Sequence, residues 1–270
     1  MRTVLTIAGS DSSGGAGIQA DIKTITMHGM YAMSAITAIT AQNTQGVFSV
    51  WETTKEQLRE QIRQTAEDIP PDAVKIGMVC GSKQVQVIAH EIRGLGLKNV
   101  VVDTVMASTS GTRFLREEAE AAMRKELLPL ARLVTPNLSE AENFTGMKIR
   151  SREEMQKAAR IMSSAFETAI LLKGGHLQGE AADLLIEEEK ETWFVHPRLE
   201  NPNTHGTGCT LSSAIACRLA AGKRLEDAVA HAKAYVTGAI RAGLNLGKGN
   251  GPLCHMWAFS QEELLKRSED

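Results

Sequence analysis

Short runs of β-branched and aliphatic residues alternate along this chain with segments of helical periodicity, and this alternation limits the possible folds more than any other feature of the sequence. The predicted strands are residues 4–8, 34–41, 73–76, 100–102, 133–135, 169–172, 183–187 and 192–196. The predicted helices are residues 18–28, 55–68, 83–93, 116–128, 139–144, 152–164, 211–221 and 225–242. Such alternation predicts a mostly parallel sheet with helices on both faces, and ligands then bind at the carboxyl ends of the strands.

The chain has 270 residues and a mass of 29.2 kDa, and we expect one large α/β domain over residues 1–270, because no linker or repeat divides it. Its net charge of −2 does not favour nucleic acid or an anionic membrane, so the expected ligand is a small molecule. No run approaches the roughly 20 apolar residues that cross a bilayer, and we expect a cytoplasmic protein. The cysteines lack CxxC or zinc-like spacing, which indicates neither a disulfide framework nor a structural metal.

Two glycine-rich turns carry the strongest functional signal. Residues 203–210, Asn-Thr-His-Gly-Thr-Gly-Cys-Thr, run directly into an apolar helix. The first amides of a helix lack internal partners and carry the positive end of its dipole, so they suit an anion or a developing negative charge. One such turn is more often an ordinary helix start, here with Thr207 as its cap. A second glycine-rich turn, residues 9–17, opens another helix, and the two together indicate a substrate between them.

The common nucleotide-binding motifs are incomplete. Residues 15–20 match the GxGxxA form of the dinucleotide fingerprint, but residues 35–40 lack the acid that would bind a ribose. Gly247 and Lys248 are followed by Gly249, where a Walker motif needs Ser or Thr. Any nucleotide must therefore bind through residues outside these two motifs.

Polar residues follow several predicted strands. Asp103 ends the run 100–102, and Asn137 precedes Glu140 by one helical turn. Oxygen ligands at strand ends suit Mg²⁺, whereas the alternative makes Asp103 a loop cap and the other two a capping pair. Lys173 precedes two glycines and is either a surface lysine or a point charge for a phosphate.

Two further residues have chemistry that suits a site. Cys209 lies where the dipole of a helix favours a thiolate, although a small cysteine chosen for packing is equally compatible with the pattern. Gln42 follows an apolar run and can both donate and accept hydrogen bonds, which suits the edge of a heteroaromatic ring better than a phosphate.

Taken together, these segments resemble the hydroxymethylpyrimidine/phosphomethylpyrimidine kinases of thiamine biosynthesis, a branch of the ribokinase-like superfamily. The segments that carry the resemblance are residues 7–21, 41–44, 75–78, 101–103, 135–141, 172–176, 203–210 and 249–253. The resemblance implies a ribokinase-like three-layer α/β/α sandwich with a mostly parallel central sheet, and usually a homodimer. It also implies ATP- and Mg²⁺-dependent phosphorylation of 4-amino-5-hydroxymethyl-2-methylpyrimidine to the monophosphate and then to the diphosphate.

The resemblance also assigns roles by position. Gln42 would bind the aminopyrimidine, Gly9, Ala16 and Asp21 would line its pocket, and Met78 and Ala107 would pack on its faces. Lys173, Asn137, Gly206 and Gly208 would contact ATP, and Asp103, Asn137 and Glu140 would organise Mg²⁺. Gly206, Thr207, Gly208 and Cys209 would form the anion hole, with Lys173 also in the catalytic set.

The chain departs from related patterns at a few positions. Sugar kinases of the superfamily have an aspartate base where this chain has Cys209. Phosphorylation of the monophosphate needs no strong base, because the attacking phosphate is already ionised. We therefore hypothesise that Cys209→Ala impairs phosphorylation of the alcohol more than phosphorylation of the monophosphate. Thr104 replaces the usual proline, which would loosen the turn after Asp103, and residues 109–111 lack a lysine found in some relatives.

Two other functions remain open at this point. A pyridoxal or pyridoxine kinase would share the scaffold and accept a similar ring that carries a hydroxymethyl group. A nucleotide or pyrimidine sensor without turnover is the alternative outside the enzymes, although the presence of Lys173, Asp103, Glu140 and Cys209 argues against it.

Overall fold

The computed structural model describes residues 1–106, 117–175 and 181–259. One nine-stranded sheet, in the order β3-β2-β1-β4-β5-β6-β7-β8-β9, runs through the molecule. The strands are β1 (Thr3–Asp11), β2 (Tyr31–Asn43), β3 (Gly46–Glu52), β4 (Ala73–Ile76), β5 (Val100–Val102), β6 (Leu133–Val134), β7 (Ala169–Lys173), β8 (Ala181–Glu187) and β9 (Lys190–His196). The central strands from β2 to β7 are parallel, and the outer strands β3, β8 and β9 pair antiparallel.

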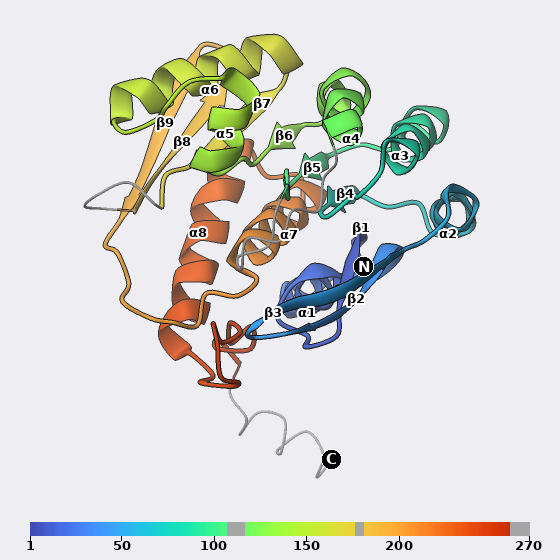
Figure 1. Ribbon diagram of the computed structural model, residues 1–270, viewed down its shortest axis with the longest axis horizontal. Helices are drawn as coiled ribbons and strands as arrows, with labels where there is room; N and C mark the ends of the chain where they lie inside the picture. Colours follow the sequence, from blue (N-terminus) through green and yellow to red (C-terminus); the bar gives the residue numbers. More distant parts are fainter. Residues whose placement is uncertain (107–116, 176–180, 260–270) are drawn as a thin grey trace.

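Helices cover both faces of this sheet (Figure 1). The helices are α1 (Gly17–Met27), α2 (Lys55–Asp68), α3 (Ser82–Gly94), α4 (Glu117–Ala122), α5 (Leu138–Thr145), α6 (Arg152–Phe166), α7 (Thr207–Ala220) and α8 (Leu225–Ala242). Helices α1, α7 and α8 lie on one face, and α2 to α6 lie on the other. The predicted α/β sandwich with a mostly parallel sheet is confirmed.

The period of two in a strand divides the apolar residues between two cores. In β5, Val100 and Val102 pack into the core under α2 to α6, whereas Val101 faces the core under α7 and α8. Strands β4, β5 and β6 are buried on both sides, which explains why they are continuous apolar runs in the sequence.

The structure corrects the predicted secondary structure at one strand and one helix. Strand β3 is not among the predicted strands, because this edge strand is only half buried and pairs with β2 alone. The helix predicted over residues 116–128 ends early: α4 passes into a π-helical turn, Met123–Leu127, and then a 3-10 turn, Leu128–Leu130, that contains Pro129.

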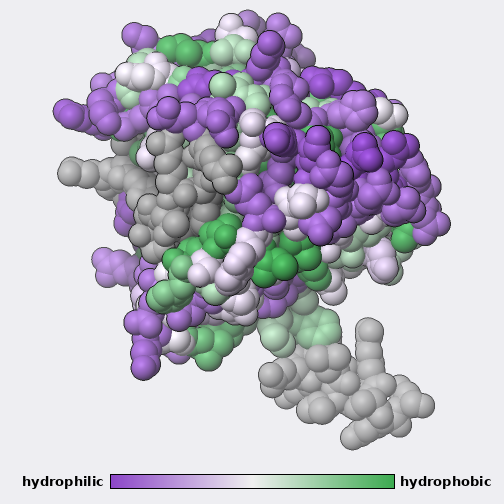
Figure 2. Space-filling model, turned by 45° about the vertical axis from the view of Figure 1, so that its right-hand side comes forward, coloured by the Kyte–Doolittle hydropathy of each residue, from purple (hydrophilic) through white to green (hydrophobic). Residues whose placement is uncertain are grey.

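The surface is uneven in polarity. Figure 2 shows a largely hydrophilic upper part and hydrophobic side chains gathered in the lower half of the same face. Among the large apolar side chains, Ile39, Phe48 and Trp51 of β2 and β3 are 53%, 68% and 59% exposed. Ile39 lies opposite Trp51 in the strand pairing, so the outer hairpin carries an exposed apolar surface. Across the described ranges, none of the helices has the length and apolar character that a membrane crossing requires.

Candidate active site

A cavity of about 560 Å³ opens at the carboxyl ends of the parallel strands. The predicted site residues that line it are Gly9, Ala16, Gln42, Met78, Asp103, Asn137, Glu140, Lys173, Gly206, Thr207, Gly208 and Cys209. Both glycine-rich turns therefore face one cavity, as the sequence analysis expected. Residues 107–114, which include Ala107 and residues 109–111, lie outside the described residues.

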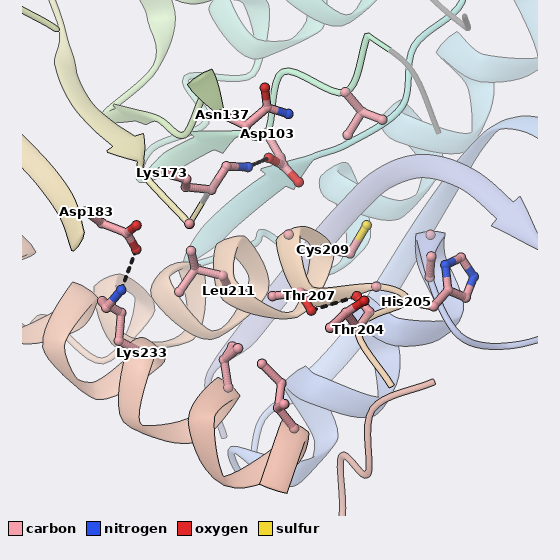
Figure 3. Close-up of a pocket in the computed structure, with 18 of the residues that line it drawn as sticks. Asp103, Asn137, Lys173, Asp183, Thr204, His205, Thr207, Cys209, Leu211 and Lys233 are labelled. Atoms are coloured by element: carbon pink, nitrogen blue, oxygen red, sulfur yellow. Dashed lines mark hydrogen bonds and ion pairs between the residues drawn. The ribbon is translucent and has the colours of Figure 1, made fainter. Parts of the chain in front are cut away.

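The start of α7 forms one wall of the cavity (Figure 3). Gly206 precedes the helix with φ +86°, and a Cβ there would lie 1.9 Å from the carbonyl oxygen of Gly15, so the two turns touch and only glycine fits. Thr207 donates its hydroxyl to the Thr204 carbonyl at 2.7 Å instead of capping the helix. Among the described residues, no side chain caps α7, so its first turn suits an anion.

Lys173 and Asp103 meet next to this helix start. The Lys173 Nζ lies 2.7 Å from Asp103 Oδ1, which also accepts from the Thr135 hydroxyl. Burial opposes both charges, but Asp103 raises the pKa of Lys173, and Lys173 with Lys75 lowers the pKa of Asp103. A Cβ on Gly208 would lie 3.1 Å from Asp103 Oδ2 and 3.6 Å from Lys173 Nζ, so a charged pair abuts the helix N-terminus.

Asn137 and Glu140 form a capping box at the start of α5. The Asn137 side chain accepts from the Glu140 amide at 2.9 Å, and Glu140 Oε2 accepts from the Asn137 amide at 2.8 Å. The alternative capping interpretation is therefore correct, and both residues also line the cavity. Burial raises the pKa of Glu140, with a further rise from Asp103 that the Lys173 charge opposes. The Thr104 hydroxyl donates to Glu140 Oε2 at 3.0 Å, a contact that proline could not make.

The oxygen atoms near Lys173 fit a cation that keeps water and phosphate ligands. Asp103 and Glu140 supply carboxylates at the cavity wall, whereas the Asn137 side-chain oxygen is occupied by the cap. Within residues 1–106, 117–175 and 181–259, no group of three or more acidic, histidine or cysteine side chains is placed to hold a metal alone. Mg²⁺ binds in this incomplete manner when substrate phosphates complete its shell.

Asp21 is predicted to line the substrate pocket, but the structure places it beneath the cavity wall. Its side chain is fully buried and accepts from Thr6 at 2.6 Å, from Lys75 at 2.8 Å and from Ser213 at 2.8 Å. The reason is the equally buried Lys75, whose charge needs an acidic partner inside the protein. Burial alone would lower the pKa of Lys75, but Asp21 raises it.

The structure also corrects the expectation of a favoured thiolate at Cys209. Burial raises the pKa of this thiol to about 11, and the carboxylates of Asp21 and Asp103 add to the rise against the opposing charge of Lys75. Cys209 therefore lines the cavity as a neutral thiol near pH 7.

Sequence reasoning missed the far end of the cavity. Asp183 of β8 pairs there with Lys233 of α8, and Asp183 also accepts from the Gly174 amide at 2.9 Å (Figure 3). Apolar side chains of α7 and α8 also line the cavity, among them Leu211, Val236 and Ile240. No contiguous motif marks these residues, because they come from separate elements.

Comparisons with known proteins identify first the class and then the family. The fold is ribokinase-like: a phosphomethylpyrimidine kinase structure from Clostridium difficile 630 matches with a TM-score of 0.80 at 45% identity, covering 89% of this chain and 100% of that one. The ADP complex of Bacillus subtilis pyridoxal kinase matches with a TM-score of 0.88 at 35% identity, covering 96% of this chain and 98% of that one.

The sequence model of the phosphomethylpyrimidine kinase family matches residues 11–254. A hydroxymethylpyrimidine/phosphomethylpyrimidine kinase from Streptomyces coelicolor is 46% identical over 258 residues, which cover 96% of each chain. The chain belongs to the phosphomethylpyrimidine kinase family.

Proposed function

We propose that this protein uses ATP and Mg²⁺ to phosphorylate 4-amino-5-hydroxymethyl-2-methylpyrimidine and then its monophosphate, producing the diphosphate for thiamine biosynthesis. The observation that carries the proposal is the approach of Lys173 and Asp103 to Gly208 at the start of α7. A cation, a carboxylate and a helix N-terminus at one cavity wall are the groups that phosphoryl transfer requires.

The described residues divide the work of transfer. The amides at the start of α7 and the ammonium of Lys173 stabilise negative charge on the migrating phosphoryl group. Asp103 and Glu140 would hold Mg²⁺, which neutralises phosphate charge when bound. Gln42 would bind the ring edge, and Met78 and Gly9, which lie against each other, line the same cavity.

The two steps differ in what they need from Cys209. The monophosphate is already ionised near neutral pH, so its attack requires no base. The alcohol must lose a proton, but burial raises the pKa of the Cys209 thiol to about 11, so the thiol is predominantly protonated at pH 7. Positioning and charge neutralisation therefore supply most of the catalysis, and proton acceptance by Cys209 is confined to the alcohol step.

A pyridoxal kinase is the second candidate, favoured by the similarity in shape to the Bacillus subtilis enzyme. A coupled assay of ADP formation with the pyrimidine alcohol, its monophosphate and pyridoxal, run side by side, separates the two. We expect turnover of both pyrimidine substrates above that of pyridoxal. A preference for pyridoxal would reverse the ranking, and no ADP with any hydroxymethyl heteroaromatic would favour a sensor.

We also propose a cytoplasmic homodimer, with the outer hairpin as the contact surface. The edge strand β3 and the exposed side chains of Ile39, Phe48 and Trp51 support it, because an apolar sheet edge tends to pair with another chain. Sedimentation of the native protein and of Trp51→Lys tests the dimer. We expect the native protein to be a dimer and Trp51→Lys to be a monomer, and a monomeric native protein would refute the proposal.

A further inference from the structure

A chain of polar contacts joins the two glycine-rich turns to Gln42. His205 Nε2 lies 2.8 Å from Asp11 Oδ2, and the carboxamide end of Gln42 assigned as Nε2 lies 3.3 Å from the same ring nitrogen. The other end of the carboxamide, assigned as Oε1, lies 3.2 Å from the Thr40 hydroxyl, which lies 2.8 Å from the Ser10 carbonyl oxygen. The roles of these atoms follow from which of them carry hydrogens.

Asp11 is a carboxylate that only accepts. Its Oδ1 accepts from the amide and the hydroxyl of Ser13 at 2.9 and 2.8 Å, and its Oδ2 accepts from the amides of Gly15 and Ala16 at 3.1 and 2.8 Å. Burial would raise the pKa of Asp11, but the hydrogen bonds from His205, Ser13 and the backbone hold it well below its usual range. His205 Nε2 must therefore carry a hydrogen and donate it to Asp11.

A ring nitrogen that carries this hydrogen cannot accept from Gln42. Because the oxygen and nitrogen of a carboxamide have nearly the same shape, the partners decide its orientation. The Gln42 oxygen must face His205, where it shares the ring hydrogen, and the Gln42 nitrogen must face Thr40. The Thr40 hydroxyl accepts from that nitrogen and donates to Ser10, so every hydrogen in the chain has an acceptor.

His205 is positioned through both its backbone and its ring. The His205 amide donates to the Gly251 carbonyl at 3.1 Å, and residue 205 pairs with Pro252 in an isolated bridge. A Cβ on Gly15 would lie 2.4 Å from the ring carbon Cδ2, so glycine at that position makes room for the imidazole. The segment around residue 251 therefore helps to position His205.

We propose that His205, anchored by Asp11, is a positioning residue that locks the carboxamide of Gln42 in one orientation and so sets which heteroaromatic ring the cavity accepts. A locked carboxamide retains one oxygen lone pair and one N–H for the ring, in a fixed order. An amino group beside a ring nitrogen matches that order, whereas a pyridine whose hydroxyl has no ring nitrogen beside it cannot pair with both ends of the carboxamide at once. The inference rests on the proposed function, in which Gln42 binds the ring.

A double-mutant cycle between His205→Phe and Gln42→Ala tests this link. We expect His205→Phe to raise the KM for the pyrimidine alcohol about tenfold, with little change in kcat or in the KM for ATP, and to lower its preference over pyridoxal. In the Gln42→Ala background His205→Phe should add little, because its effect passes through Gln42. His205→Gln, which keeps an N–H donor, should restore part of the affinity.

Thr40→Val approaches the same carboxamide from its other end and serves if His205→Phe does not fold. It should also raise the KM for the alcohol and relax the preference over pyridoxal. Independent, additive effects of His205→Phe and Gln42→Ala, or an unchanged preference in both His205→Phe and Thr40→Val, would overturn the proposal. If Gln42→Ala alone leaves calorimetric binding of the alcohol unchanged, the failure lies in the proposed function of the cavity, and the role of His205 falls with it.

Discussion

The ammonium group of Lys75 lies 2.8 Å from the Asp21 carboxylate, and neither side chain has any exposed surface. Asp21 also accepts from Thr6 of β1 and from Ser213 of α7, so one carboxylate connects two strands and two helices beneath the active-site wall. Removal of either partner would leave a charge buried without a counterion.

Asp21→Ala is expected to lower the free energy of unfolding by about 3–5 kcal/mol, because Lys75 is then unpaired in the core. Urea denaturation followed by circular dichroism measures the loss. Arg224 and Asp227 form an exposed ion pair, and Asp227→Ala, the control, should cost far less stability than Asp21→Ala, because water screens exposed charges. Equal losses in the two variants would show that the buried pair does not hold these elements together.

Gly208→Ala is expected to lower kcat by about 10- to 100-fold, because its methyl group would press on Asp103 and Lys173 at the anion site. Gly94→Ala is the matched control: it lies in α3, and no described atom lies within 4 Å of a Cβ there. The control should keep full activity and gain up to about 1 kcal/mol of stability. Steady-state kinetics and thermal melts distinguish the two, and full activity in Gly208→Ala would argue against a crowded anion site.

Cys209→Ala is expected to slow phosphorylation of the alcohol more than that of the monophosphate. Because the pKa of the thiol is about 11, the ratio of alcohol rate to monophosphate rate in the native enzyme should rise between about pH 7 and 9 as more thiolate forms. The variant should lose this rise. Both rates are measured side by side over this pH range in the native enzyme and in Cys209→Ala. An equal loss of rate in the two steps would rule out Cys209 as a proton acceptor.

Stability is expected to fall in mild acid because of His255. Burial lowers the pKa of this histidine from 6.5 to about 4, with Lys23 adding to the shift, and its Nε2 lies 3.0 Å from the Thr210 hydroxyl. Between these pH values the unfolded chain binds a proton that the folded protein does not. The contribution of His255 to the free energy of unfolding is therefore fully present above about pH 6.5 and is lost as the pH falls toward 4.

The loss due to this one group is at most about 3 kcal/mol. Unfolding of the native protein and of His255→Gln across this range isolates it, because the other histidines titrate in both proteins. Identical pH profiles would show that His255 does not contribute.

The elements of the sheet were largely predictable from the sequence. Strands β4 and β5 were predicted with their observed bounds, because strands buried on both faces are short continuous apolar runs. The edge strand β3 was missed for the converse reason, since its half-exposed residues carry no such run. The glycine-rich turns were predictable because backbone geometry depends on neighbouring residues.

The electrostatics of the site were not predictable in the same way. The position of Cys209 at a helix start suggested a thiolate, but burial from other segments raises its pKa. Asp21 was assigned to the substrate by its place in a motif, although the charge that it balances, Lys75, lies 54 residues away. The contact between Asp11 and His205 spans 194 residues.

The sequence by itself determined the family, most of the strands and helices, and the turns that reach the cavity, since each depends on residues close together in the chain. Only the tertiary structure decided which charges are paired, which thiol is neutral and which carboxylate is buried away from the cavity. Burial and ion pairing depend on distances in space between segments that are remote in the chain.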